Sequence, residues 1–440
     1  MEKTFFRSVC ALAVPAALQS MLQSSFGIVD QIMIGQLGSV SIAGVGFAGK
    51  FSSIFSVAVS AMGAVAGIMM AQYLGKGNRG EVRRSFFVNL RLAMVLAAVF
   101  TGASVLFPET LMGLYTKDAA AIRAASGYLV ITAATFLPMA GATMLASLLR
   151  CLERASLPLY ASIAAALTNT GLNYLLIFGC GGLPALGERG AAIATAISQW
   201  VNLLVMLVLF WRSRGCLNGA GDRESAFRWR RYAGMLLPVL ACELLWSLGE
   251  NVYAAIYGHI GTAASAAMIL INPIQGLMTG ALCGLSQAAG VLVGKGLGSG
   301  DYDRAYAEGR KLVWYGLAGS VLISFLIVLS RGWYVELYRV EEAVKALTES
   351  ILLAYALVAP FKVGNMILSG GVLRSGGRTE YVMVIDIVGT WGFGVPLGLM
   401  AAFFLELPIY WVYFILSLEE CVRFGIGAWV FRRRKWMRSL

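Results

Sequence analysis

The sequence has few of the residues that catalysis and metal binding need. It contains a single histidine, His259, and seven cysteines without any Cys-x-x-Cys pair. The cysteines lie mostly inside apolar runs, so we expect small buried thiols and neither zinc sites nor a disulfide framework. One histidine in a predicted outer turn cannot complete a Ser/His/Asp or Cys/His set. We therefore predict no enzymatic activity, no cofactor and no bound metal other than a transported Na⁺.

Charged residues are also scarce, at 13 % of the 440 positions, whereas 58 % are hydrophobic and the mean hydropathy is +0.74. These values exclude an ordinary soluble domain. Apolar runs long enough to cross a bilayer of about 30 Å recur along the whole chain and predict an all-α integral membrane protein with twelve transmembrane helices. We place them at 8–34, 43–72, 86–107, 123–147, 157–179, 190–211, 232–257, 264–294, 311–330, 350–373, 380–404 and 409–431.

The lysines and arginines concentrate in alternate connections between these helices. If both termini face the cytoplasm, 25 of them lie on the inner side, 6 on the outer side and 4 inside the helices. This excess follows the positive-inside rule, so we predict a multi-pass protein of the cell membrane with both termini in the cytoplasm. The same distribution explains the net charge of +12 without a nucleic-acid partner.

The chain contains a duplication. A shift of 223 residues leaves 13 of the 63 positions in 15–77 identical, and five of the 13 are glycines, whose places depend on the backbone. The superimposed pairs include Pro15/Pro238, Gly75/Gly298 and Gly77/Gly300. An even number of helices in each copy gives both copies the same orientation, so the repeat is parallel and pseudo-symmetric.

The duplication predicts two lobes. The polar stretch 212–230 is interpreted as a cytoplasmic linker between an N-terminal six-helix lobe at 1–211 and a C-terminal six-helix lobe at 231–440. In so apolar a chain, duplicated units are typical of a transporter whose site lies between the halves.

Several motifs resemble those of the multidrug and toxic compound extrusion (MATE) family, in family order and over nearly the full chain. They are Pro15 to Gly46 with Asp30-x-x-Met33-x-Gly35-x-x-Gly38, GIMMAQYLGKGN at 67–78 with its partner VLVGKGLGSGD at 291–301, Asn169-x-x-Leu172-Asn173, Gly190 to Thr195, and LRSGGRTEY at 373–381. The resemblance implies a V-shaped pair of six-helix bundles and alternating access. It also implies export of organic, often cationic, compounds in exchange for H⁺ or Na⁺.

The chain departs from the family pattern at two places. Asn173 stands where many relatives have an aspartate, and Trp246 stands where many have a glutamate, with Glu243 one turn before it and Glu250 one turn after. Which lobe carries the coupling ion is therefore left open.

Four residues of the first lobe are candidates for cation coupling. Asp30 lies about one turn from the outer end of the first helix, and a carboxylate shielded from water can bind and release a proton near neutral pH. The alternative is a structural salt bridge to Lys50 of the second helix, and making or breaking that pair can itself act as a switch. Asn169 and Asn173 share a helix face and can coordinate Na⁺, bond to Asp30, or join helices through amide hydrogen bonds.

Candidates for substrate binding lie on the seventh helix. Glu243 and Glu250 are seven residues apart and share one face, which suits an organic cation or a shared proton. Asn251 and Trp246 adjoin them, and Gln23 adds polarity to the first helix. The alternative is that the two glutamates hydrogen-bond to other helices within their lobe.

Asp386 and Glu419 are secondary candidates. Asp386 can pair internally with Lys362 or with the loop that holds Arg374 and Arg378. Glu420 and Arg423 lie three residues apart and are expected to pair, whereas the neighbouring Glu419 points elsewhere.

These observations predict a secondary active antiporter that exports organic cations or amphipathic drugs in exchange for H⁺ or Na⁺ and works as a monomer in the lipid bilayer. The alternative is a flippase for a lipid-linked precursor, an activity found on a related two-lobe fold. A flippase needs a more basic cavity for phosphates, whereas the deep charges here include more acids than bases.

Overall fold

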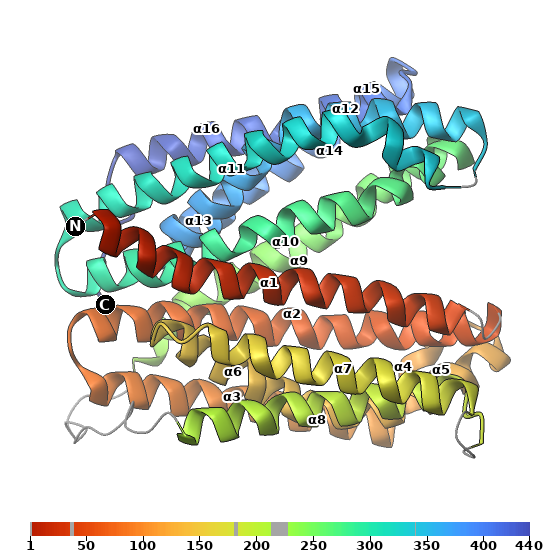
Figure 1. Ribbon diagram of the computed structural model, residues 1–440, viewed down its shortest axis with the longest axis horizontal. Coiled ribbons are helices and arrows are strands. Elements are labelled where there is room, and N and C mark those ends of the chain that lie inside the picture. Colours follow the sequence, from red (N-terminus) through yellow and green to blue (C-terminus); the bar gives the residue numbers. More distant parts are fainter. Residues whose placement is uncertain (1, 36–38, 180–183, 213–227, 339) are drawn as a thin grey trace. The chain divides into compact units, whose positions relative to one another are not determined.

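The computed structural model describes residues 2–35, 39–179, 184–212, 228–338 and 340–440, and these contain helices and no strand (Figure 1). The chain forms two compact units. One consists of 1–70 and 79–224, and the other of 71–78 and 225–440.

The first unit holds the helices of the first sequence repeat. They are α1 (Glu2–Gly35), most of α2 (Ser39–Gly75), α3 (Arg79–Leu106), α4 (Pro108–Gly113), α5 (Ala119–Thr132), the 3₁₀ turn η1 (Ala133–Thr135), α6 (Phe136–Cys151), α7 (Ser156–Phe178) and α8 (Glu188–Arg212). In this unit α7 packs against both α1 and α8. The helix of Asp30 therefore lies beside the helix of Asn169 and Asn173.

The second unit holds the end of α2 and the helices from α9 onward. These are α9 (Trp229–Ile260), α10 (Thr262–Gly298), α11 (Tyr302–Glu336), α12 (Glu342–Asn365), η3 (Met366–Leu373), α13 (Thr379–Asp386), η4 (Ile387–Gly394), α14 (Val395–Leu399), η5 (Met400–Phe404), α15 (Ile409–Ser417) and α16 (Glu419–Arg432). The segments η3, η4 and η5 are π-helical. Here α12 packs against α10, α15 and α16, and α9 packs against α10 and α13.

The predicted membrane helices are present. Eleven helices of the described chain are long and apolar enough to cross a bilayer, and they coincide with the first eleven predicted spans. The twelfth, at 409–431, is formed by α15 and α16, which Leu418 divides into two short pieces. Leu418 keeps helical dihedrals (φ −61°, ψ −17°), so the chain continues in helical form through the break. The prediction of twelve apolar helices is thus confirmed.

Glycines that the duplication superimposes mark a close crossing of the ends of α2 and α10 inside the second unit. A Cβ atom on Gly75 would collide with the carbonyl of Lys295, and one on Gly298 would collide with the carbonyl of Gln72. Because the 223-residue shift also relates Gln72 to Lys295, the two contacts mirror each other. The glycine matches in the sequence therefore have a packing cause.

The segment after α16 folds back onto the second unit. Trp436 is 0 % exposed and lies so close to Gly376 that a Cβ atom there would collide with it. The side chain of Gln72 donates to the carbonyl of Arg438 at 3.1 Å and accepts the Leu440 N–H at 2.7 Å. The tail is therefore held by packing as well as by hydrogen bonds.

The predicted linker at 212–230 lies outside the described residues except for Arg212 and 228–230. The lobe boundaries at 211 and 231, and the cytoplasmic placement of both termini, stay predictions.

Candidate functional site

A cavity of about 210 Å³ opens in the first unit between α1, α7 and α8. Its polar lining comes from Gln23, Asp30, Ser162, Asn169, Thr195, Ser198, Gln199 and Asn202. Asp30 is the one ionisable side chain among the described residues that line it, and the rest are amides, hydroxyls and apolar groups. The cavity therefore surrounds a single carboxylate with neutral polar groups.

A chain of hydrogen bonds holds this carboxylate. The buried amide of Asn173 donates from Nδ2 to Asp30 Oδ1 at 2.6 Å and to Asn169 Oδ1 at 3.1 Å. Asn169 Nδ2 in turn donates to Thr195 Oγ1 at 3.4 Å. Three predicted coupling residues thus come together. Thr195, at the end of the Gly190–Thr195 motif, is a fourth member that the sequence reasoning did not single out.

Lys50 does not join this group. Its side chain is exposed, and within the described part of the chain no ion pair links it to Asp30. The structural salt bridge considered from the sequence is therefore corrected: a neutral amide, Asn173, satisfies the carboxylate, while a long lysine stem can carry its charge to water. Gln23 lines the Asp30 cavity, so it lies with the coupling candidates of its own unit.

The oxygen atoms of this group suit a hard monovalent cation. Asn173 Oδ1 is buried and has no hydrogen-bond partner among the described residues. With the oxygens of Asp30, Asn169 and Thr195 it offers the ligand type that hard cations prefer. The described residues contain no group of three or more His, Cys, Asp or Glu that could hold a metal ion.

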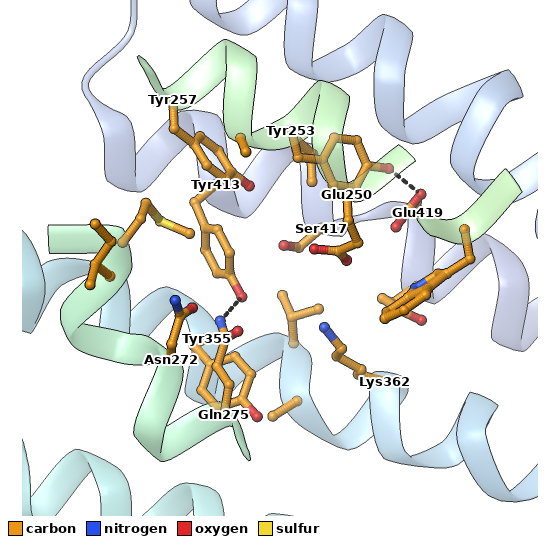
Figure 2. A pocket seen from close by; sticks show the side chains of 18 of the residues that line it. Glu250, Tyr253, Tyr257, Asn272, Gln275, Tyr355, Lys362, Tyr413, Ser417 and Glu419 are labelled. Carbon is orange, nitrogen blue, oxygen red and sulfur yellow. Dashed lines mark hydrogen bonds between the residues drawn. The ribbon is translucent and has the colours of Figure 1, made fainter. Parts of the chain in front are cut away.

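A second cavity, of about 340 Å³, lies in the second unit among α9, α10, α12, α15 and α16 (Figure 2). Its walls carry five large aromatic side chains: Trp246, Tyr253, Tyr257, Tyr355 and Tyr413. The Gln275 amide donates to the hydroxyl of Tyr413 at 3.0 Å. The cavity is therefore aromatic with polar hydroxyl and amide edges.

Four charged side chains also line this second cavity: Glu250, Lys362, Glu419 and Glu420. The hydroxyl of Tyr253 donates to Glu419 at 2.7 Å. Glu420 accepts the Asn365 amide at 2.7 Å and forms the expected ion pair with Arg423 at 3.6 Å. Glu250 and Lys362 point into the cavity from opposite walls (Figure 2).

Two acids of the second unit that do not line the cavity, Asp386 and Glu243, pair with arginines. Asp386 accepts from the guanidinium of Arg423 and from the thiol of Cys242. This corrects the expectation that Asp386 pairs with Lys362 or with the loop arginines. The pairing with Arg423 was not predicted from the sequence, because Arg423 lies on a different helix of the bundle.

Glu243 belongs to the same side of the bundle and accepts from Arg374 Nη1 at 3.4 Å. It does not line the cavity, although it shares a face with Glu250. Seven residues are about 10 Å along a helix, so Glu243 lies beyond the cavity wall.

The other two candidates of α9 lie on different faces. Trp246 lines the cavity and is 49 % exposed. Asn251 is exposed, donates to the carbonyl of Ser247 at 2.7 Å on its own helix, and is not among the lining residues. The roles assigned to all these residues stay predictions.

Known proteins resemble this chain over almost its full length. The MatE family model matches residues 15–175 and 238–400, and the two matches begin at the prolines that the internal shift superimposes. A probable multidrug resistance protein NorM of Rhodopseudomonas palustris is 27 % identical over 96 % of this chain and 90 % of the relative. The uncharacterized transporter YisQ of Bacillus subtilis is 22 % identical over 100 % of this chain and 96 % of its own.

A solved structure shows the same fold. The crystal structure of MATE in complex with MaL6 matches with a TM-score of 0.89 at 18 % identity, covering 97 % of this chain and 95 % of that one. The fold is therefore the predicted all-α one, with twelve transmembrane helices in two six-helix bundles. The family model covers both repeats and more than half of the chain. The chain is thus a member of the MatE family, the multidrug and toxic compound extrusion family whose motifs it carries.

Proposed function

We propose that this protein is a secondary active antiporter that exports organic cations or amphipathic compounds from the cytoplasm in exchange for H⁺ or Na⁺. Membership of the MatE family and similarity to proteins named for multidrug resistance support the export of drugs. The observation that supports ion coupling is the Asp30 cavity, in which one carboxylate has only neutral polar groups around it.

Binding of the coupling ion at Asp30 would change the hydrogen bonds of this carboxylate. A proton on the carboxylate removes the charge to which the Asn173 amide donates, and so weakens a charge-assisted hydrogen bond. A sodium ion would instead draw the oxygens of Asp30, Asn169 and Asn173 around itself. Either event alters the contacts that hold α1 against α7. Such a change can favour one conformation over the other, as alternating access requires.

The second cavity provides the larger, aromatic space that an organic substrate needs. Its three carboxylates outnumber its one ammonium. This balance disfavours the alternative of a flippase for a phosphate-bearing lipid precursor.

Dye uptake into inverted membrane vesicles tests the proposal. A fluorescent organic cation should accumulate when the lumen is acidic or rich in Na⁺, and collapsing each gradient separately identifies the coupling ion. Asp30→Asn should abolish the gradient-driven component. Asp118→Asn is a matched control, because Asp118 caps α5 in an exposed position and asparagine caps helices equally well.

Two results contradict the proposal. Uptake that continues unchanged after both gradients are collapsed excludes antiport. Gradient-driven uptake that survives in Asp30→Asn excludes Asp30 as the coupling group.

A further inference from the structure

The charged side chains of the second cavity fall into two classes. Glu419 and Glu420 are engaged by Tyr253 and by Asn365 with Arg423, respectively. Glu250 and Lys362 make no hydrogen bond or ion pair with any residue that the structure describes. The cavity therefore presents one carboxylate and one ammonium whose direct partners are missing.

Lys362 is the more unusual of the two. An ammonium within a transmembrane helix is costly unless an anion accompanies it. Glu250, Glu419 and Glu420 are near enough to act on it electrostatically, but none lies within ion-pair distance. Its side chain points toward the middle of the cavity, where a ligand would lie (Figure 2).

The cavity has the size and walls of a site for a small aromatic molecule. Its volume of about 340 Å³ is at the lower end of the range for ligand pockets. Tyr355 and Tyr413 lie to one side of the line between Glu250 and Lys362 (Figure 2), and Trp246 also lines the cavity. Such rings can stack on an aromatic body, and their faces attract cations.

We propose that this cavity binds small aromatic zwitterions, with the ammonium of the ligand at Glu250 and its carboxylate or other anionic group at Lys362. The inference deepens the proposed function by naming a substrate class for the second bundle. Binding itself requires no ion gradient and no involvement of Asp30.

The arrangement discriminates by charge. A simple cation pairs with Glu250 but leaves Lys362 without a direct anionic partner and is repelled by it. A simple anion pairs with Lys362 but meets Glu250 and the field of Glu419 and Glu420. Only a ligand with both charges satisfies both groups, so it should bind at least tenfold more tightly than either singly charged derivative of the same body.

Isothermal titration of the purified full-length protein in detergent tests this order. The probes are tryptophan and para-aminomethylbenzoate, which differ in the spacing of their charges. Each is used as the zwitterion, as the cationic methyl ester and as the anionic N-acetyl derivative. At least one zwitterion should bind tenfold or more tightly than both of its derivatives. The proposal is overturned if neither zwitterion binds, or if each ester binds as tightly as its zwitterion.

Two variants assign the charges to residues. Lys362→Met should lower the affinity of the zwitterion at least tenfold and raise that of the methyl ester, because the repelling ammonium is gone. Glu250→Gln should shift the preference toward the N-acetyl anion. Lys435→Met, which removes an exposed lysine that does not line the cavity, should change nothing. An unchanged order in both cavity variants also overturns the proposal.

A failure here is distinguishable from a failure of antiport. Dye uptake in vesicles reports on ion gradients and Asp30, whereas titration reports on Glu250 and Lys362 without any gradient. Thermal unfolding of each variant distinguishes a lost affinity from a lost fold.

Discussion

The two cavities use the same face of the repeated first helix but place different chemistry on it. Under the 223-residue shift, the lining positions Gln23, Gly27 and Asp30 of α1 fall on the lining positions Trp246, Glu250 and Tyr253 of α9. The carboxylate of the second copy, Glu250, therefore lies one turn earlier on its helix than Asp30 does in the first copy. An aromatic hydroxyl now stands where the first copy has its acid.

This difference fits the proposed division of tasks between the two copies. The first cavity is small and holds one acid within a web of amides, which suits an ion. The second is larger and aromatic and holds charges of both signs, which suits an organic ligand. In each cavity a neutral donor also holds one acid at short distance: Asn173 to Asp30 at 2.6 Å and Tyr253 to Glu419 at 2.7 Å.

The largest effect on stability is expected at the glycine contacts that both copies share. Gly75→Val and Gly298→Val each place a side chain against a backbone carbonyl that cannot move away, so each should cost about 3 kcal/mol or more. Thermal unfolding of the purified protein should show similar losses for both, because the two contacts mirror each other. Gly67→Ala, with open space around its Cβ position, is the control.

A loss in only one of the two valine variants would show that the crossing is not symmetric in its energetics. The two copies would then differ in energy at the contact where their structures are most alike.

An intermediate effect is expected from the donors that hold the two acids. Asn173→Leu should destabilise the protein by about 1.5–3 kcal/mol, the range for hydrogen bonds to charged groups. Tyr253→Phe should cost less, because Asn173 also bonds to Asn169 whereas Tyr253 holds Glu419 alone. Chemical unfolding in detergent measures both.

Tyr257→Phe is the matched control for this pair, since the Tyr257 hydroxyl bonds to no residue that the structure describes. A larger cost for Tyr253→Phe than for Asn173→Leu would mean that the aromatic cavity is the more tightly organised of the two.

The smallest effect is expected at Asn251. Asn251→Ala should change stability by no more than about 0.5 kcal/mol and dye transport by less than about twofold, because the side chain bonds only to its own helix. Glu250→Gln, one residue earlier and inside the cavity, should lower dye transport about tenfold or more in the same vesicle assay, because an organic cation loses the carboxylate with which it pairs. Equal effects at the two positions would contradict the proposed placement of the substrate at the cavity face of α9.

Much of the fold could be predicted because it depends on features that are local in sequence. Long apolar runs mark the helices, and Gly77 (φ +74°) and Gly300 (φ +80°) are turn glycines that stand in register in both repeats. The break at Leu418 was not predicted, because the apolar run continues through it.

The sites were predicted in part, for a similar reason. Asn169 and Asn173 are four apart on one helix, so their shared face was readable, and their meeting with Asp30 required only that their helices be neighbours. The pairing of Asp386 with Arg423, and the place of Lys362 opposite Glu250, depend on how separate helices rotate and pack. The residue pattern within a single helix does not predict how that helix rotates and packs against the others.

The folded-back tail has a practical consequence for handling this protein. Because Trp436 is enclosed by the second unit and Gln72 hydrogen-bonds to the backbone of Arg438 and Leu440, a purification tag fused directly after Leu440 would continue from this packed seam. A tag at the opposite end of the chain, or a flexible glycine-serine spacer, leaves that seam undisturbed.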